Sequence, residues 1–64
     1  MVRINGEDVA ADGKTLAAYL NECSYTTERV AVELNGDIVP KAAYGETVLN
    51  AGDEVEIVAF VGGG

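Results

Sequence analysis

Gly13-Lys14-Thr15 has the residue types that close a phosphate-binding loop, in which backbone N–H groups and a lysine hold the phosphates of a nucleotide. That motif requires another glycine five positions before Gly13, where this sequence has Asp8. The segment is instead typical of a turn that enters a helix, with Thr15 as the helix-capping residue. We therefore interpret it as a structural turn and not as a nucleotide site.

Cys23 is the single cysteine of this 64-residue chain and its most nucleophilic side chain. The sequence contains no histidine that would activate the thiol. Cys23 also falls on the apolar stripe of a predicted helix, so we expect a small core residue. A single cysteine excludes an internal disulfide, and together with the lack of histidine it excludes the usual zinc frameworks.

Asp53, Glu54 and Glu56 are the densest group of carboxylates in the sequence. Acid–base catalysis places such groups in a cleft, and a chain of this length has little room to build one. Glu54 and Glu56 share one face of the last predicted strand. We therefore expect them to face solvent or to form an acidic rim against a basic partner.

Three consecutive glycines, Gly62, Gly63 and Gly64, follow the last predicted strand. Glycine loses the most conformational entropy on ordering, so we predict a flexible tail over 62–64 after a folded domain over 1–61. Three residues reach about 10 Å when extended, enough to carry the Gly64 carboxylate through a narrow channel into a partner's active site. The alternative is a frayed end, and the tail alone does not decide between the two.

The strand predicted over residues 54–61 should present two different faces. The core-facing side chains would be Val55, Ile57 and Ala59. The outward-facing side chains would be Glu54, Glu56, Val58 and Phe60. Two large apolar groups on a solvent face beside the tail indicate a partner-docking surface. A β-bulge that turns Phe60 into the core is the alternative.

Alternation of apolar and polar residues predicts further strands over residues 2–5, 8–11, 30–34 and 38–39. The first two would form a hairpin whose loop exceeds two residues, and the strand over 38–39 would be an edge strand ended by Pro40. A helix over 15–24 would carry an apolar stripe consisting of Leu16, Tyr19, Leu20 and Cys23. Between 41 and 50 we expect a short helical turn, with Val48 and Leu49 packing inward. This order predicts an α+β fold of the β-grasp (ubiquitin-like) type, a mixed sheet of about five strands with one main helix across one face.

The charge balance limits the partners. Eleven acids and four bases give a net charge of −7, and the bases are scattered along the chain. Nucleic acids and anionic membrane surfaces attract clustered lysine and arginine, so neither is expected as a partner. We expect a protein partner with a basic surface, because opposite charges favour association. The alternative is that the negative charge only keeps the protein soluble. No apolar run is long enough for a membrane span and the start does not resemble a signal peptide, which predicts a cytoplasmic protein.

The chain resembles, over its whole length, the ThiS-type sulfur-carrier proteins of thiamin (thiazole) biosynthesis, within the ThiS/MoaD ubiquitin-like family. The resemblance is carried by residues 2–6, 13–16, 31–35 and 39–40 and, most specifically, by Gly52-Asp53-Glu54-Val55-Glu56-Ile57-Val58 running into Phe60-Val61-Gly62-Gly63-Gly64. The terminal glycines are the working feature of the family. The ending looks more like the thiazole branch than the molybdopterin branch.

The resemblance implies a carrier that acts as a protein co-substrate and not as an enzyme. A ThiF-like adenylating enzyme would use ATP to adenylate the Gly64 carboxylate, and a sulfur-donor protein would convert it to a thiocarboxylate. A ThiG-like thiazole synthase would then take the sulfur. The carrier itself would bind no cofactor and no metal. Gly62 and Gly63 would thread the carboxylate into its partners, and Val58, Phe60 and Val61 would contact them.

Three other functions remain open from the sequence. A related carrier could serve molybdopterin synthesis or tRNA thiolation, and a ubiquitin-like tag could be joined to lysines of other proteins. A pure interaction module would use the same sheet face with an idle tail.

Overall fold

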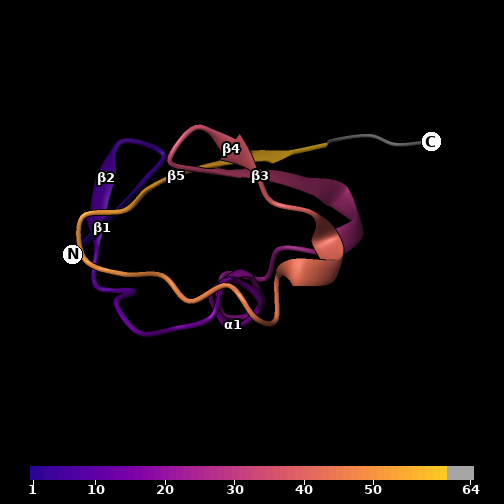
Figure 1. The fold of residues 1–64 in the computed structure, drawn as a ribbon. Coiled ribbons are helices and arrows are strands. Elements are labelled where there is room, and N and C mark those ends of the chain that lie inside the picture. The colour runs from indigo at the N-terminus through magenta and orange to yellow at the C-terminus, as the bar shows by residue number, and fades with distance from the viewer. Residues whose placement is uncertain (61–64) are drawn as a thin grey trace.

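Five strands form one mixed sheet in a computed structural model, which describes residues 1–60 (Figure 1). The strands are β1 (Val2–Ile4), β2 (Glu7–Val9), β3 (Val30–Leu34), β4 (Asp37–Ile38) and β5 (Glu54–Ala59). Their order across the sheet is β2-β1-β5-β3-β4, in which β1 and β5 are parallel and the other neighbours are antiparallel. The strand that leads toward the glycines is therefore the central one. The predicted mixed sheet of about five strands with one main helix is confirmed.

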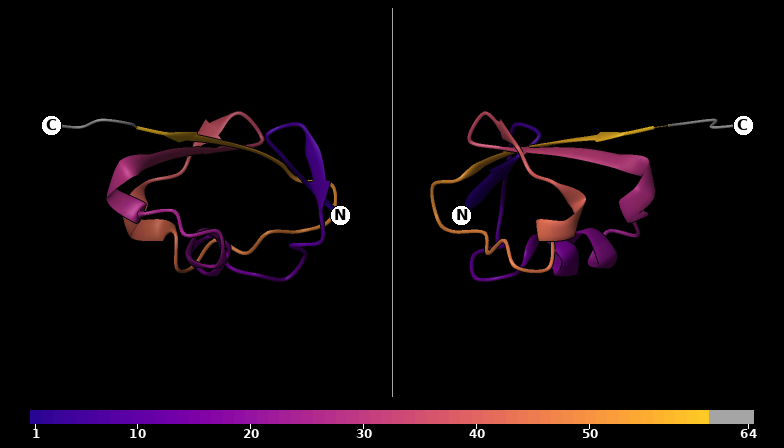
Figure 2. Two further views of the ribbon diagram at one scale, coloured as in Figure 1. Left: turned by 180° about the vertical axis from the view of Figure 1, so that it is seen from behind. Right: turned by 45° about the vertical axis from the view of Figure 1, so that its right-hand side comes forward.

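A second layer lies against one face of the sheet (Figures 1 and 2). It contains the helix α1 (Leu16–Glu22), the short 3-10 helix η2 (Lys41–Ala43) and the extended segment that leads back to β5. The 3-10 helix η1 (Thr27–Arg29) connects this layer to β3. The core fills the space between the layers and consists of Val2, Ile4, Ala11, Leu16, Leu20, Val30, Val32, Tyr44, Leu49, Val55 and Ile57. The opposite face of the sheet has no covering layer among the described residues.

The helix α1 begins where the sequence predicts. The N–H of Ala18 donates to the Thr15 hydroxyl oxygen at 3.1 Å, so Thr15 is the N-cap. The helix ends at Glu22, and Cys23 is its C-cap with φ −91° and ψ 7°. The predicted burial of Cys23 is wrong, because the chain leaves helical geometry there and the side chain is exposed.

The segment after η2 is partly as predicted. Tyr44 and Leu49 are buried, whereas Val48 is 45% exposed, so its predicted packing inward is wrong. Val48 and Thr15 form an isolated antiparallel bridge, and neighbouring side chains of an extended segment point to opposite sides. Burial of Leu49 therefore turns Val48 outward.

The hairpin β1–β2 has a loop of two residues, since Ile4 and Glu7 are paired directly. The predicted longer loop is wrong. Asn5 and Gly6 have φ of 51° and 84°, as in the tight turns that match the twist of a hairpin. Asparagine tolerates this left-handed conformation better than most residues, and glycine adopts it without a steric cost.

The side chain of Asn5 continues the ladder between β1 and β5 after the β1 backbone has turned away. Its Nδ2 donates to the Ile57 carbonyl oxygen at 3.2 Å, and its Oδ1 accepts from the Ile57 N–H at 2.7 Å. Both bonds are partly buried. Asn5 thus holds the middle of β5 through the two groups that a paired strand would otherwise satisfy.

We expect Asn5→Ala to lower the free energy of unfolding by about 2 to 4 kcal/mol, because two hydrogen bonds are lost and alanine disfavours a positive φ. Asn5→Gly, which relieves the backbone conformation but not the hydrogen bonds, should give a smaller loss. Urea unfolding of the wild type and the two variants measures the contributions of the hydrogen bonds and of the backbone conformation. Stability of Asn5→Gly at or above that of the wild type would contradict the expected loss.

Candidate functional site

The two faces of β5 differ as the sequence predicts for most of its length. Val55 is fully buried and Ile57 is 6% exposed, whereas the outward-facing side chains are exposed. Ala59, expected in the core, is exposed at the end of the strand, so that expectation is wrong. Ala59 is paired with Val30, the first residue of β3, and the second layer does not cover its side chain there.

Phe60 follows β5 and is 54% exposed, while its backbone N–H donates to the Arg29 carbonyl oxygen at 2.7 Å. The alternative in which a bulge buries Phe60 is therefore wrong. Val58 is 57% exposed on the outer face of the sheet. Both side chains have the exposure that a docking surface requires, and docking itself stays a prediction.

Ile38 joins these two residues, and the sequence analysis did not single it out. It lies directly opposite Glu33 in the β3–β4 pairing, so it faces outward, and it is 73% exposed. We call Ile38, Val58 and Phe60 the outer apolar patch. The run Ile38-Val39 signals that one of the two residues faces out, but only the strand register shows which one.

Two shallow hollows adjoin the outer apolar patch. The smaller one, about 180 Å³, is lined by Ala31, Val32, Glu33, Ile38, Glu56 and Val58. The larger one, about 330 Å³, is lined by Val30, Ala31, Val32, Ile38, Val39, Pro40, Lys41, Tyr44 and Phe60. Ile38 borders both hollows, so the outer apolar patch is an uneven surface with depressions and not a flat sheet face.

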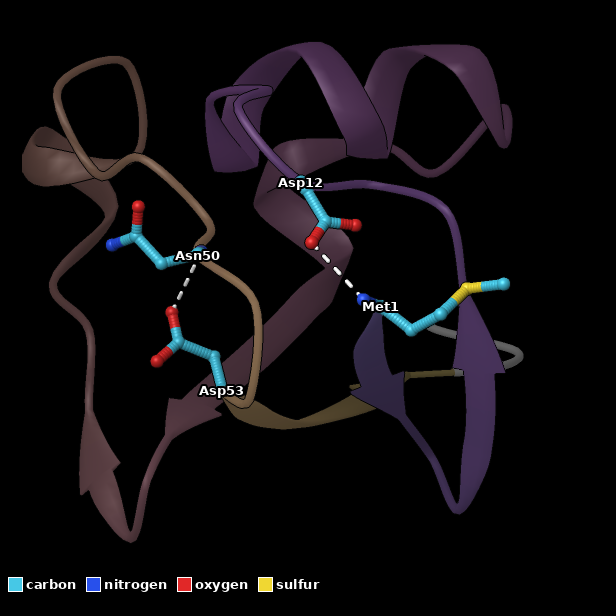
Figure 3. Close-up of polar contacts among 4 residues, drawn as sticks. All are labelled: Met1, Asp12, Asn50 and Asp53. Carbon is cyan, nitrogen blue, oxygen red and sulfur yellow. Dashed lines mark hydrogen bonds and ion pairs between the residues drawn. The ribbon is translucent and has the colours of Figure 1, made fainter.

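The acidic residues of β5 and its preceding turn divide into two groups. Both carboxylate oxygens of Asp53 accept hydrogen bonds from within the chain. One accepts from the Asn50 N–H at 2.9 Å (Figure 3), and the other accepts from Asn35 Nδ2 at 3.1 Å. Glu54 and Glu56 are exposed on the outer face. Asp53 is thus part of a turn, whereas the two glutamates are available to a partner.

Other polar contacts lie in the second layer and at the N-terminal residues. The Met1 amino group lies 3.0 Å from Asp12 Oδ2 (Figure 3), and its hydrogen bond and charge hold the pKa of Asp12 below its usual range. Lys14 is paired with Glu22, in agreement with a structural role for the Gly13-Lys14-Thr15 turn. Burial, followed by a hydrogen bond with Cys23, raises the pKa of Tyr19 to about 12.

Residues 1–60 contain no group of three or more histidine, cysteine or acidic side chains placed to hold a metal ion. In the same range no helix has the length and apolar character needed to cross a bilayer. Val61, Gly62, Gly63 and Gly64 lie outside the described residues, so the predictions made for them stay predictions.

A family model described as the ThiS family matches residues 1–64, the whole chain. The chain belongs to the ThiS family. A sulfur carrier protein ThiS from Bacillus subtilis is 39% identical over 66 residues, and the match covers 100% of both chains. A crystal structure of a thiamine biosynthesis protein (ThiS) from Geobacter metallireducens has a TM-score of 0.77 and 33% identity, and the match covers 98% of this chain and 97% of that one.

Longer proteins also contain a region similar to this ThiS-family chain. A thiazole synthase from Paramagnetospirillum magneticum is 47% identical over 62 residues, which is 95% of this chain and 19% of that protein. The chain therefore spans about a fifth of the length of the thiazole synthases that it matches. A region similar to this chain thus occurs both over the whole length of one relative and over part of a longer one.

Proposed function

We propose that this chain is a sulfur carrier for the thiazole part of thiamin biosynthesis, with the Gly64 carboxylate as the group that is loaded. A carboxylate oxygen attacks the α-phosphorus of ATP on a ThiF-like activating enzyme, and pyrophosphate leaves. The terminal sulfur of a donor protein's persulfide then displaces AMP at the carbonyl carbon. A second thiol cleaves the acyl disulfide and leaves the thiocarboxylate, which donates its sulfur to thiazole synthase.

Family membership over the whole chain carries this proposal. The relatives from Bacillus subtilis and Thermus thermophilus that match from end to end are named sulfur carrier protein ThiS. The match to part of two thiazole synthases favours the thiazole pathway over molybdopterin synthesis, tRNA thiolation or protein tagging. A carrier and an enzyme that share one polypeptide in those relatives suggest partners that meet in the same reaction.

The geometry of the described residues supports a carrier role in two ways. The strand β5 is central in the sheet, paired with β1 on one side and β3 on the other, and it precedes the terminal residues in the sequence. The outer apolar patch and the exposed glutamates lie on and beside this strand. A partner that binds the tail would therefore find a docking surface next to it.

The test is intact-mass and peptide-mass measurement of the protein with its activating enzyme, ATP and a sulfur donor. The mass of the untreated protein from its own organism first shows whether the polypeptide ends at Gly64. We expect the mass gain of one oxygen-to-sulfur exchange, located in the C-terminal peptide. Location is essential, because oxidation of Met1 or Cys23 adds nearly the same mass. No gain at Gly64, with a competent enzyme and a working control carrier, would contradict the proposal.

A further inference from the structure

The smaller hollow on the outer face combines apolar walls with two carboxylates. Its apolar lining comes from Ala31, Val32, Ile38 and Val58, and its charged lining comes from Glu33 and Glu56. Ile38 and Val58 are among the most exposed large apolar residues of the described chain. An occupant that fits this hollow would therefore have an apolar stem and a positively charged end.

The two carboxylates lie in an arrangement that costs stability. Glu33 and Glu56 are directly opposite each other in the β3–β5 pairing, and like charges at such positions repel. Within residues 1–60 the ion pairs involve Asp8, Asp12 and Glu22, and neither Glu33 nor Glu56 takes part in one. Arg3, on the same face, lies opposite Glu54 and is paired with Asp8.

We propose that this hollow binds an arginine side chain of the protein that docks on the outer face of the sheet. The inference rests on the proposed function, for which it specifies the chemistry of the partner. The aliphatic stem of an arginine would lie against Ile38 and Val58, and its planar head would donate to Glu33 and Glu56 together. A lysine ammonium is a single point charge and lacks the forked geometry that bridges two carboxylates.

Stability and binding should respond in opposite directions to loss of either carboxylate. Glu33→Gln or Glu56→Gln removes the repulsion between the strands, so we expect the melting temperature to rise by about 1 to 5 °C. The same change removes an acceptor of the arginine, so we expect at least about tenfold weaker binding of the partner. A carboxylate present only for solubility would show the rise in melting temperature without the loss of binding.

The experiment measures the affinity of the 64-residue chain for the thiazole synthase of the same organism, by calorimetry at low and high salt. The variants are Glu33→Gln, Glu56→Gln and the double variant. Glu46→Gln is the matched control, because Glu46 is exposed after η2 and lines neither hollow. We expect the two single losses to be non-additive, since both carboxylates would bind one guanidinium group. Affinities equal to that of the control would overturn the inference.

A second measurement identifies the type of cation. Phenylglyoxal modifies arginine side chains of the synthase, and reductive methylation modifies its lysines while keeping their charge. We expect phenylglyoxal treatment to abolish the difference between the wild type and Glu33→Gln, and methylation to preserve it. A difference that survives phenylglyoxal treatment would overturn the assignment to arginine.

Failure of this inference is distinct from failure of the proposed function. If the wild-type chain acquires sulfur at Gly64 and binds the synthase, but its affinity does not depend on Glu33 and Glu56, only the arginine site is rejected. If the wild-type chain acquires no sulfur at Gly64 and does not bind the synthase, the proposed function fails and the inference fails with it.

Discussion

Deletion of Gly64 is expected to reduce thiocarboxylate formation by at least about 100-fold, because the terminal carboxylate would move back by one residue, about 3.5 Å, from the reacting ATP. Glycine has no side chain to pack, so the melting temperature should stay within about 2 °C of the wild type. The measurement is the initial rate of sulfur incorporation by mass spectrometry, with thermal unfolding of the same samples. Normal loading of the shortened protein would contradict the role of Gly64.

The companion variant Gly63→Ala tests whether the tail is threaded through a narrow channel. A methyl group at this position would crowd a channel that fits only backbone, so we expect impaired adenylation with an unchanged fold. Gly45→Ala is the matched control, since a Cβ at Gly45 meets no atom within 4 Å and its backbone does not lie in the left-handed region. Equal adenylation of both variants would show that the activating enzyme does not require a residue without a side chain at position 63.

Phe60→Asp is expected to weaken the complex with thiazole synthase by about 30-fold or more while lowering the free energy of unfolding by only about 1 kcal/mol. Large aromatic side chains at the centre of an interface commonly account for 2 kcal/mol or more of binding, roughly the 30-fold stated. Phe60 is 54% exposed, and the hydrogen bond from its backbone to Arg29 does not involve the side chain. Affinity and urea unfolding are measured on the same variant.

Val48→Asp is the matched control for this prediction. Val48 is 45% exposed, undergoes the same change from apolar to acidic, and belongs to the second layer instead of the outer face. We expect its affinity for the synthase to stay within about twofold of the wild type. An equal loss of affinity in both variants would mean that added negative charge, and not the outer apolar patch, controls binding.

Local patterns in the sequence predicted the helix and the longer strands, but not the 3-10 helix η1, and they placed β2 and β4 one residue too far along the chain at their starts. Alternation in 2–5, 30–34 and 54–61 predicts β1, β3 and β5, and the spacing of Leu16 and Leu20 predicts α1, because side-chain periodicity follows directly from strand and helix geometry. Thr15 as N-cap is likewise readable, since the capping bond spans only three residues. The sequence also indicates the exposed outer face of β5, because burial of Val55 and Ile57 turns Glu56 and Val58 outward.

The errors occur where local pattern competes with tertiary context. Cys23 continues the helical spacing of Leu16 and Leu20, but the helix ends at Glu22. Val48 and Leu49 are equally apolar, and only the bridge to Thr15 determines which of them is buried. Ala59 has the correct alternation for the core but lies at a sheet end that the second layer does not cover.

The sequence by itself predicted the β-grasp class, a last strand with an acidic and apolar outer face, and the terminal glycines, because the elements and their faces are encoded in local patterns. That this last strand, β5, is central in the sheet was shown only by its pairing with β1 and β3. Only the tertiary structure placed Ile38 and Val58 around one hollow, and Glu33 opposite Glu56. Both placements depend on the pairing of β3 with β4 and β5, which joins residues up to 29 positions apart. A one-residue shift in that register would turn each of these side chains to the other face, so the composition of the outer surface is decided by strand pairing.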